Sequence, residues 1–287
     1  MLDSLVLRKF TNYLELIRFK RPIGFLLLMW PCWFSLTLIN LDTITLINWL
    51  IIFFLGSFIM RSAGCIINDI IDIDIDKTVI RTQNRPLTAK NVSMIEAVLI
   101  LIFFLFLGFL ILLRFNLYSI ILGLLSMPLV IIYPFMKRIT YWPQVVLGIT
   151  FSWGVLIVST QFNETLTFQF LLLYIACVLW TIGYDTIYAY QDRIDDINQN
   201  IKSTAVYFGE KGQRFVTICY TLVLIIFGFL GWNSSNSLFS LFIIAILGIC
   251  TYIAIQKWDM HSKESSNFYF RQNNIFASML FLYLLIF

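Results

Sequence analysis

Long apolar stretches separated by short polar segments run along almost the whole sequence. Each stretch has about 20 residues, the length that crosses a membrane as an α-helix, and none shows the alternation typical of a barrel strand. We expect nine such helices, at residues 22–40, 46–67, 93–113, 117–135, 143–160, 167–190, 213–231, 236–256 and 268–287. The pattern therefore predicts an all-α polytopic membrane protein whose helices pack into one bundle.

The composition agrees with this pattern. Of the 287 residues, 60% are hydrophobic and 13% are charged, whereas an average soluble domain is about 25% charged. Polar side chains are too few to cover a soluble fold, which excludes a soluble enzyme, a disulfide-rich secreted module and a disordered chain. No linker rich in Pro, Gly or Ser divides the sequence, so residues 1–287 are expected to form a single domain that begins with a basic segment over residues 1–21.

The basic residues lie almost entirely on one side of the expected membrane. Five of the 20 Lys and Arg residues precede the first helix, and thirteen lie around the connections that follow helices two, four, six and eight. Because cytoplasmic loops are enriched in Lys and Arg, this distribution predicts that the N-terminus and these connections are cytoplasmic.

Half of the 16 acidic residues lie in two short segments, at the cytoplasmic ends of expected helices two and six. Three aspartates of each segment share one helical face, and like charges placed so closely repel each other. Oxygen ligands without His or Cys suit a hard divalent cation, and Mg²⁺ commonly links carboxylates to substrate phosphates. The candidate metal ligands are Asp69, Asp72 and Asp76 in the first segment and Asp185, Asp192 and Asp196 in the second. Asp74 lies off the shared face and is expected to be solvated.

Basic side chains accompany both acidic segments. Arg61 lies two helical turns before Asn68 on the same face, and carboxylate-bound Mg²⁺ flanked by Arg and Lys is a usual means of holding a diphosphate. The other candidate bases are Arg81 and Arg85 after the first segment, Lys137 and Arg138 at the end of helix four, and Lys202 after the second segment. Arg61 also suits a buried counter-ion of the aspartates, and the two bases of helix four also suit an anchor at the membrane surface.

These segments resemble the two motifs of the UbiA superfamily of intramembrane aromatic prenyltransferases. The first motif, NDxxDxxxD, stands here as Asn68, Asp69, Asp72 and Asp76, and the second begins at Tyr184-Asp185 and runs through Asp192 and Asp195-Asp196 to Lys202-Ser203. The family usually carries glycine where Asn200 stands, and Asn accepts a left-handed backbone better than most residues. The resemblance covers roughly residues 12–215. Within the superfamily the 4-hydroxybenzoate polyprenyltransferases match best, through Arg21-Pro22-Ile23-Gly24 and Tyr133-Pro134-Phe135-Met136-Lys137-Arg138.

The resemblance implies an enzyme that uses Mg²⁺ to transfer a polyprenyl group from polyprenyl diphosphate to the ring carbon ortho to the hydroxyl of 4-hydroxybenzoate, a step of ubiquinone biosynthesis. It implies a bacterial or mitochondrial inner membrane, a central cavity open toward the cytoplasmic side, contact with membrane lipids and no nucleic-acid partner. The catalytic residues would be Asp72, Asp76, Asp192, Asp196 and Lys137. The substrate-binding residues would be Arg61, Asn68, Arg81, Arg85, Tyr133, Lys137, Arg138, Tyr188 and Lys202.

Two alternatives remain at this point. Relatives with the same motifs could use another acceptor, such as homogentisate, a naphthoate, haem or a chlorophyll-type alcohol. A cation transporter could also need clustered carboxylates, but its site normally lies near the membrane midplane, whereas both clusters here lie at one rim beside arginines that repel a cation.

Overall fold

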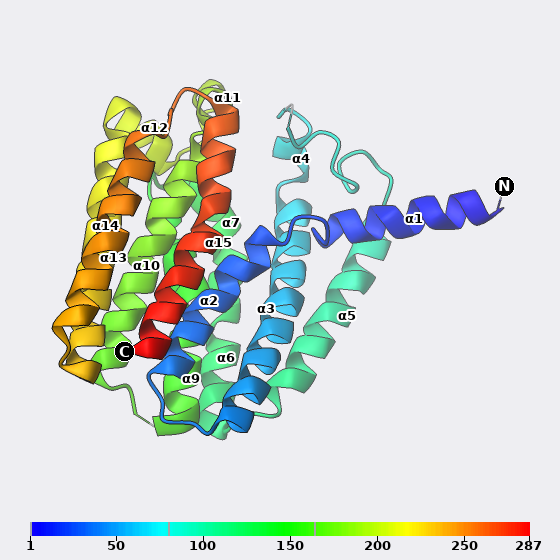
Figure 1. Cartoon of the computed structure of the whole chain (residues 1–287). Coiled ribbons are helices and arrows are strands. Elements are labelled where there is room, and N and C mark those ends of the chain that lie inside the picture. Colours follow the sequence, from blue (N-terminus) through cyan, green and yellow to red (C-terminus); the bar gives the residue numbers. More distant parts are fainter. Residues whose placement is uncertain (1, 80, 164) are drawn as a thin grey trace.

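The computed structural model describes residues 2–79, 81–163 and 165–287, and helices account for all the regular secondary structure in these ranges. Most of the helices lie side by side and form a single bundle (Figure 1), which confirms the predicted fold class. They are α2 (Ile23–Thr37), α3 (Thr43–Ile71), α5 (Met94–Leu112), α6 (Leu117–Leu125), α7 (Met127–Ile139), α8 (Pro143–Ser152), α9 (Gly154–Asn163), α10 (Phe168–Ala189), α13 (Gly212–Ser235), α14 (Leu238–Gln256) and α15 (Lys263–Ile286). The remaining elements are α1 (Leu2–Leu16), α4 (Ile73–Asp76), α11 (Arg193–Asn198), α12 (Thr204–Phe208) and the 3-10 helix η1 (Gly209–Lys211).

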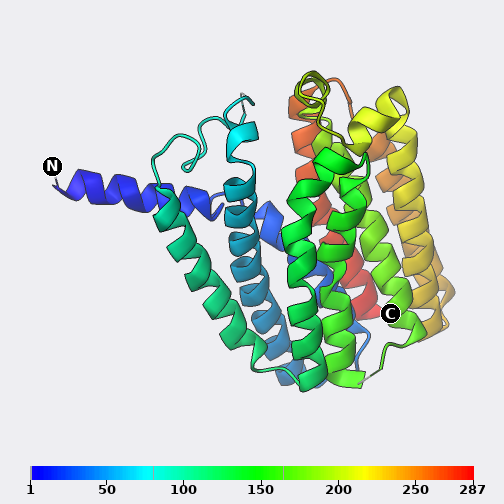
Figure 2. The same ribbon diagram turned by 180° about the vertical axis from the view of Figure 1, so that it is seen from behind.

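Seven segments of the described chain are long and apolar enough to cross a membrane, so the chain is an integral membrane protein. Two of them are made of helix pairs, α6 with α7 and α8 with α9, which continue each other along the bundle (Figure 2). Two of the nine expected spans are not among the seven. Helix α2 has 15 residues, a length of about 22 Å against about 30 Å of hydrocarbon, and α15 begins with several polar residues. The count of nine spans therefore stays a prediction.

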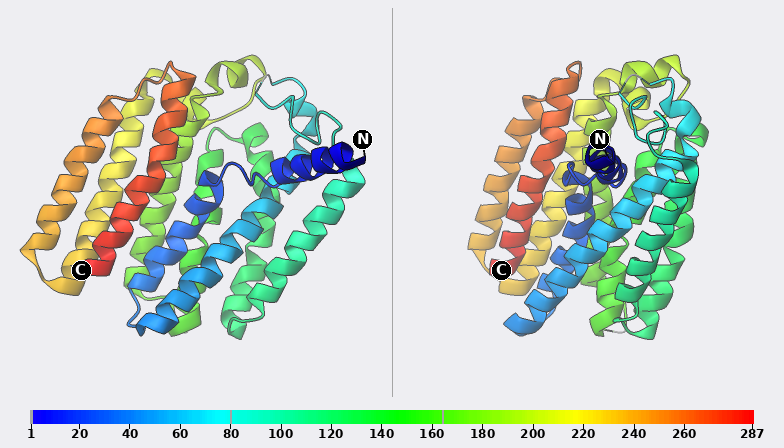
Figure 3. Two further views of the ribbon diagram at one scale, coloured as in Figure 1. Left: turned by 45° about the vertical axis from the view of Figure 1, so that its right-hand side comes forward. Right: turned by 90° about the vertical axis from the view of Figure 1, so that its right-hand side faces the viewer.

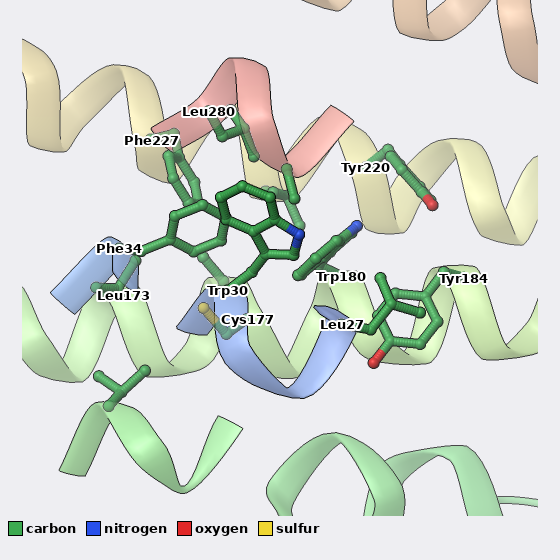
Figure 4. Close-up of a cluster of buried hydrophobic side chains, with 14 of the residues drawn as sticks. Leu27, Trp30, Phe34, Leu173, Cys177, Trp180, Tyr184, Tyr220, Phe227 and Leu280 are labelled. Carbon is green, nitrogen blue, oxygen red and sulfur yellow. The ribbon is translucent and has the colours of Figure 1, made fainter. Parts of the chain in front are cut away.

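Helix α10 is the most buried of the seven segments, and the main hydrophobic cluster forms around it. Trp180 of α10 packs against Phe34 of α2, which packs against Phe227 of α13 (Figure 4). The Trp180 Nε1 donates a hydrogen bond to Oδ1 of Asn273 on α15 at 2.9 Å. Because an unpaired polar group is costly in an apolar interior, this bond helps to fix α10 against α15.

Gly154 at the start of α9 lies against α2, and a Cβ there would overlap the Sγ of buried Cys32. We expect Gly154→Ala to lower the free energy of unfolding by about 1–3 kcal/mol, the usual cost of an overpacked core. Thermal unfolding of the purified protein in detergent measures this change. Adding Cys32→Ala removes the overlapping sulfur and should restore most of the lost stability. A double variant no more stable than Gly154→Ala would contradict this explanation.

Both acidic segments lie at the same end of the bundle, where α4 and α11 are found, and the C-terminus lies at the other end (Figure 1). Figure 3 shows α1 crossing near the charged end at a steep angle to the long helices. The Lys9 and Tyr13 side chains of α1 donate hydrogen bonds to Glu96 at the start of α5, and Leu16 is buried against Ile66 of α3. The basic N-terminal segment is therefore held at the end of the bundle that carries the acidic segments.

Candidate active site

A cavity of about 1140 Å³ lies between α2, α3, α7, α8, α10 and α15. The aspartates of both segments line it at the end where α4 and α11 lie. Apolar side chains line it further along, among them Phe53, Leu112 and Phe115. Phe53 precedes Ile71, the last residue of α3, by 18 residues, a rise of about 27 Å along the helix. The cavity thus joins one charged end to a long apolar interior.

The first acidic segment lies where α3 ends and α4 begins, and its three face-sharing aspartates are buried. Asp69 and Asp72 are each 1% exposed and Asp76 is 4% exposed. Arg18 Nη2 donates to both carboxylate oxygens of Asp69, at 2.6 and 2.7 Å. Arg85 Nη1 donates to Asp69 at 3.0 Å and to Asp76 at 2.6 Å. Charge-assisted bonds of this length are among the stronger ones in proteins, so these buried carboxylates are held by bases from outside the segment.

Asp72 lies between α3 and α4 and is bonded to the end of α7. Lys137 Nζ donates to Asp72 Oδ2 at 2.5 Å, and Arg138 Nη2 donates to Asp72 Oδ1 at 3.4 Å. Lys137 lines the cavity, whereas Arg138 is not part of its lining. Asp74 is exposed and pairs with Lys77 at 2.7 Å, which confirms that it lies apart from the shared face.

The second acidic segment faces the loop that follows the first. Arg81 donates to Asp192 from Nε at 2.8 Å and from Nη2 at 2.6 Å, and its Nη1 donates to the Tyr188 hydroxyl at 3.0 Å. Asp185 also lines the cavity and makes no hydrogen bond or ion pair with the residues that the structure describes. The two segments are therefore joined by an arginine fork, whereas Asp185 interacts with Arg61 electrostatically without forming an ion pair.

The hydrogen-bond donor to Asp196 is a hydroxyl group and not a basic side chain. The Ser203 hydroxyl donates to its Oδ2 at 3.3 Å. Burial raises the pKa of the Asp196 carboxyl to about 7, and repulsion from Asp192 adds to the shift. A cation close to such a carboxyl favours its charged form, so Asp196 is chemically suited to metal binding.

The loop after α11 joins the second segment to α7. The backbone N–H of Lys202 donates to the Lys137 carbonyl at 2.8 Å, and its Nζ donates to the Ile139 carbonyl at 2.9 Å. Asn200 in this loop has a φ of 54°, the left-handed conformation that the sequence position favours. Lys137 and Lys202, from opposite halves of the chain, are thereby held at one junction.

Arg61, Asn68 and Tyr133 line the same cavity. The Arg61 guanidinium lies over the Phe151 ring, 5.4 Å from its centroid, a cation–π arrangement. A Cβ at Gly24 would lie 2.8 Å from Arg61 Nε, so glycine at this position leaves room for the guanidinium. Arg61 forms no ion pair with any described residue, although it interacts electrostatically with Asp185, so its guanidinium N–H groups can still bind an anion.

All the predicted site residues except Arg138 thus line one cavity, and their individual roles stay predictions. Two contributions were not predicted from the sequence. Arg18 pairs with Asp69 and has a φ of 59°, which is uncommon for a residue other than glycine; no local pattern identifies it. Asn267, Arg271 and Asn274 of α15 also line the cavity. Their spacing within a mostly apolar helix is a signal that could have identified them.

The aspartates suit a hard divalent cation in kind, because they offer only oxygen ligands, and in place, because all six line one cavity. In the described part of the chain, no three acidic, His or Cys side chains converge closely enough to hold a metal ion. Most of the carboxylates point instead toward Arg and Lys side chains. A metal would therefore have to exchange partners with these bases.

Comparison with known proteins adds an independent finding. The sequence profile of the UbiA prenyltransferase family matches residues 28–284. The 4-hydroxybenzoate octaprenyltransferase of Blochmanniella pennsylvanica is 40% identical over 258 residues, which cover 88% of this chain and 88% of that protein. The mitochondrial 4-hydroxybenzoate polyprenyltransferase of Aedes aegypti is 51% identical over 213 residues, which cover 71% of this chain and 47% of that protein. The chain spans about half the length of the insect relatives it matches.

The fold also matches solved structures. A UbiA homolog from Archaeoglobus fulgidus, solved with GPP and Mg²⁺, superposes with a TM-score of 0.70 at 16% identity, covering 96% of this chain and 100% of that one. A UbiA homolog from Aeropyrum pernix gives a TM-score of 0.69 at 23% identity, covering 92% of this chain and 97% of that one. At these identities the likeness establishes the fold.

Proposed function

This chain belongs to the UbiA prenyltransferase family, and we propose that it transfers a polyprenyl group from polyprenyl diphosphate to the ring carbon ortho to the hydroxyl of 4-hydroxybenzoate. The reaction would depend on Mg²⁺ and serve ubiquinone biosynthesis. Relatives named for this reaction support the proposal. The structural observation that carries it is a cavity with one charged end and a long apolar interior, because an isoprenoid diphosphate has the same division into a charged head and an apolar tail.

The diphosphate binds at the charged end of the cavity. Mg²⁺ held there would supply the positive charge that makes the diphosphate a better leaving group. Arg81, Lys137 and Lys202 donate to phosphate oxygens and stabilise the charge that develops as the C1–O bond breaks. Asp69, Asp72, Asp76, Asp185, Asp192 and Asp196 would hold the metal. Among these, Asp72, Asp76, Asp192 and Asp196 act with Lys137 as the catalytic residues, and Arg85 and Arg138 support the phosphate end.

The aromatic acceptor binds beside the allylic carbon. Arg61 lines the cavity, forms no ion pair with a described residue and lies two helical turns below Asn68, so it pairs with the benzoate carboxylate. Asn68, Tyr133 and Tyr188 line the space around the ring. The ring carbon attacks C1 of the prenyl group, the diphosphate departs, and the ring then loses its proton. The apolar interior excludes water, which would otherwise react with the positive charge that develops at C1 of the prenyl group.

We place this activity in a bacterial or mitochondrial inner membrane, with the N-terminus and the charged end of the cavity on the cytoplasmic side. The concentration of Lys and Arg at that end supports this orientation. Ile95, Leu99, Ile102 and Phe106 follow one face of α5 and are exposed, so membrane lipids would contact this face. Nothing in the proposed reaction requires a nucleic acid.

Membranes that contain the protein are expected to convert radiolabelled 4-hydroxybenzoate and a polyprenyl diphosphate into a lipid-soluble product when Mg²⁺ is present. The product is measured by extraction into organic solvent. EDTA should reduce its formation to background, because the diphosphate then keeps its charge, and excess Mg²⁺ should restore it.

Membranes prepared without the protein are the control for this assay. The same membranes are also supplied with homogentisate and a naphthoate. A prenylated product from one of these acceptors and none from 4-hydroxybenzoate would refute the proposed acceptor. Full activity in EDTA would refute the dependence on a divalent metal.

A further inference from the structure

Helix α15 carries a polar face that none of the roles above uses. Asn267, Arg271 and Asn274 are spaced i, i+4 and i+7 and so share one side of the helix, and all three line the cavity. Arg271 comes eight residues after Lys263, the first residue of α15, about 12 Å along the helix. An ionisable side chain that lines a cavity within a membrane-spanning bundle is a candidate for a function.

Arg271 lies level with the second acidic segment. The ring of its neighbour Phe270 is 4.7 Å from the Tyr188 ring and 6.0 Å from the Tyr184 ring, measured between centroids. Tyr188 in turn accepts a hydrogen bond from Arg81 at 3.0 Å. The helical turn that carries Arg271 therefore borders the charged end of the cavity.

The same side of α15 meets α2 only further along the helix. There Asn274 accepts a hydrogen bond from Trp30 Nε1 at 2.8 Å, and Phe281 packs against the Trp30 ring at 5.9 Å. Toward the start of α15 the two helices separate (Figure 1), and the Arg271 side chain is exposed. Ile23 at the start of α2 lines the cavity on the other side of this separation. Arg271 thus lies at the edge of the cavity, between α2 and α15.

Arg271 and Asn274 both offer hydrogen-bond donors. Arg271 makes no hydrogen bond or ion pair with the described residues. The Asn274 carbonyl oxygen already accepts from Trp30, so its NH₂ group is the part left for a ligand. A guanidinium one helical turn from an amide NH₂ suits an anion with several oxygens, such as a phosphate.

We propose that Arg271 and Asn274 form a first docking site for the diphosphate group of a polyprenyl diphosphate that arrives from the membrane between α2 and α15. This proposal rests on the proposed function, which supplies the substrate. The substrate is held here by its phosphate oxygens before it moves to the aspartates. Arg271 takes no part in bond making and acts only on the arrival of the substrate.

The test compares a long-chain polyprenyl diphosphate, which partitions into the membrane, with geranyl diphosphate, which can approach the charged end from water. Arg271→Gln is expected to raise the KM for the long-chain substrate about tenfold, the value of one charge-assisted contact. The kcat and the KM for 4-hydroxybenzoate should stay within about twofold of wild type, as should the KM for geranyl diphosphate, because none of these depends on arrival from the lipid.

Arg214→Gln is the matched control. Arg214 lies on α13, is exposed and does not line the cavity, and its substitution removes the same charge. An unchanged KM for the long-chain substrate in Arg271→Gln would overturn the proposal. An equal rise for both diphosphates would overturn it too, by placing Arg271 at the final diphosphate position. So would a rise confined to 4-hydroxybenzoate, by assigning Arg271 to the acceptor carboxylate.

The rate of binding separates this proposal from the proposed function. A radiolabelled long-chain polyprenyl diphosphate is added to the protein in lipid nanodiscs without any acceptor, and its association is followed in time. An association rate constant about tenfold lower in Arg271→Gln supports the docking site, even if the wild-type protein proves to prenylate a different acceptor. An unchanged association rate overturns the docking site and leaves the proposed reaction standing.

Discussion

Asp72→Ala and Asp192→Ala are each expected to reduce prenyl transfer about a thousandfold, the upper range for removal of one group that stabilises a transition state. Asp72 is 1% exposed and bonded to Lys137 at 2.5 Å, and Asp192 is held in the Arg81 fork. Each substitution removes a proposed oxygen ligand of the metal and also the partner that positions a phosphate-binding base. The turnover number at saturating substrates, measured in membranes, tests this expectation.

Asp74→Ala is the matched control for Asp72→Ala. Asp74 lies in the same segment, but its side chain is 87% exposed and, among the described residues, forms an ion pair with Lys77 alone. Because exposed ion pairs contribute little, this variant should keep its activity within about twofold of wild type. The amount of each variant in the membrane and its thermal unfolding show whether it has folded. A folded Asp72→Ala protein as active as Asp74→Ala would mean that the first segment does not hold the metal.

Arg61→Met is expected to raise the KM for 4-hydroxybenzoate by about ten- to a hundredfold, because a hydrogen bond to a charged group contributes about 1.5–3 kcal/mol. The guanidinium lies over Phe151, faces the cavity and has no ion pair among the described residues. The KM for the diphosphate should change much less. Steady-state kinetics with each substrate varied in turn separate the two effects.

Gly24→Ala tests the position of the Arg61 guanidinium without removing its charge. The added Cβ would lie 2.8 Å from Arg61 Nε, so the guanidinium must shift and the acceptor KM should rise, by less than in Arg61→Met. An acceptor without a carboxylate, such as 4-hydroxybenzaldehyde, should be a poor substrate for wild type and no worse for Arg61→Met. If Arg61→Met still uses 4-hydroxybenzoate better than 4-hydroxybenzaldehyde, another residue binds the carboxylate.

The bundle could be predicted because hydropathy is a local property of the sequence. Each expected span corresponds to a helix or a helix pair, but the ends differ. Helix α3 continues to Ile71, past the expected end at 67, because its last turn carries Asn68 and Asp69 into the charged end of the cavity. Helix α15 starts at Lys263 and not at 268 for a related reason. Its first turns carry polar residues on the side that faces the cavity. These residues lower the hydropathy of the segment, so a span identified from its hydropathy starts later than the helix.

The aspartates of the site could also be predicted from the sequence, because spacing along a helix determines which side chains share a face. The partners of these carboxylates were not. Asp69 pairs with Arg18 across 51 positions and Asp72 pairs with Lys137 across 65, and such pairs depend on how the helices pack. The left-handed Arg18 and the exposed Arg271 likewise acquire their positions only from tertiary structure.

The hydrogen bonds from Lys202 to the end of α7 have a consequence for the electrostatics of the whole site. Together with the Lys137–Asp72 and Arg81–Asp192 pairs, they place basic and acidic groups beside one another at the charged end of the cavity. Opposite charges paired in this way largely cancel at distances beyond about 8–10 Å. From afar the site therefore attracts neither a lone cation nor a lone anion strongly. It best suits a ligand whose own positive and negative charges balance. Mg²⁺ and the diphosphate are therefore most readily bound together, as an ion pair.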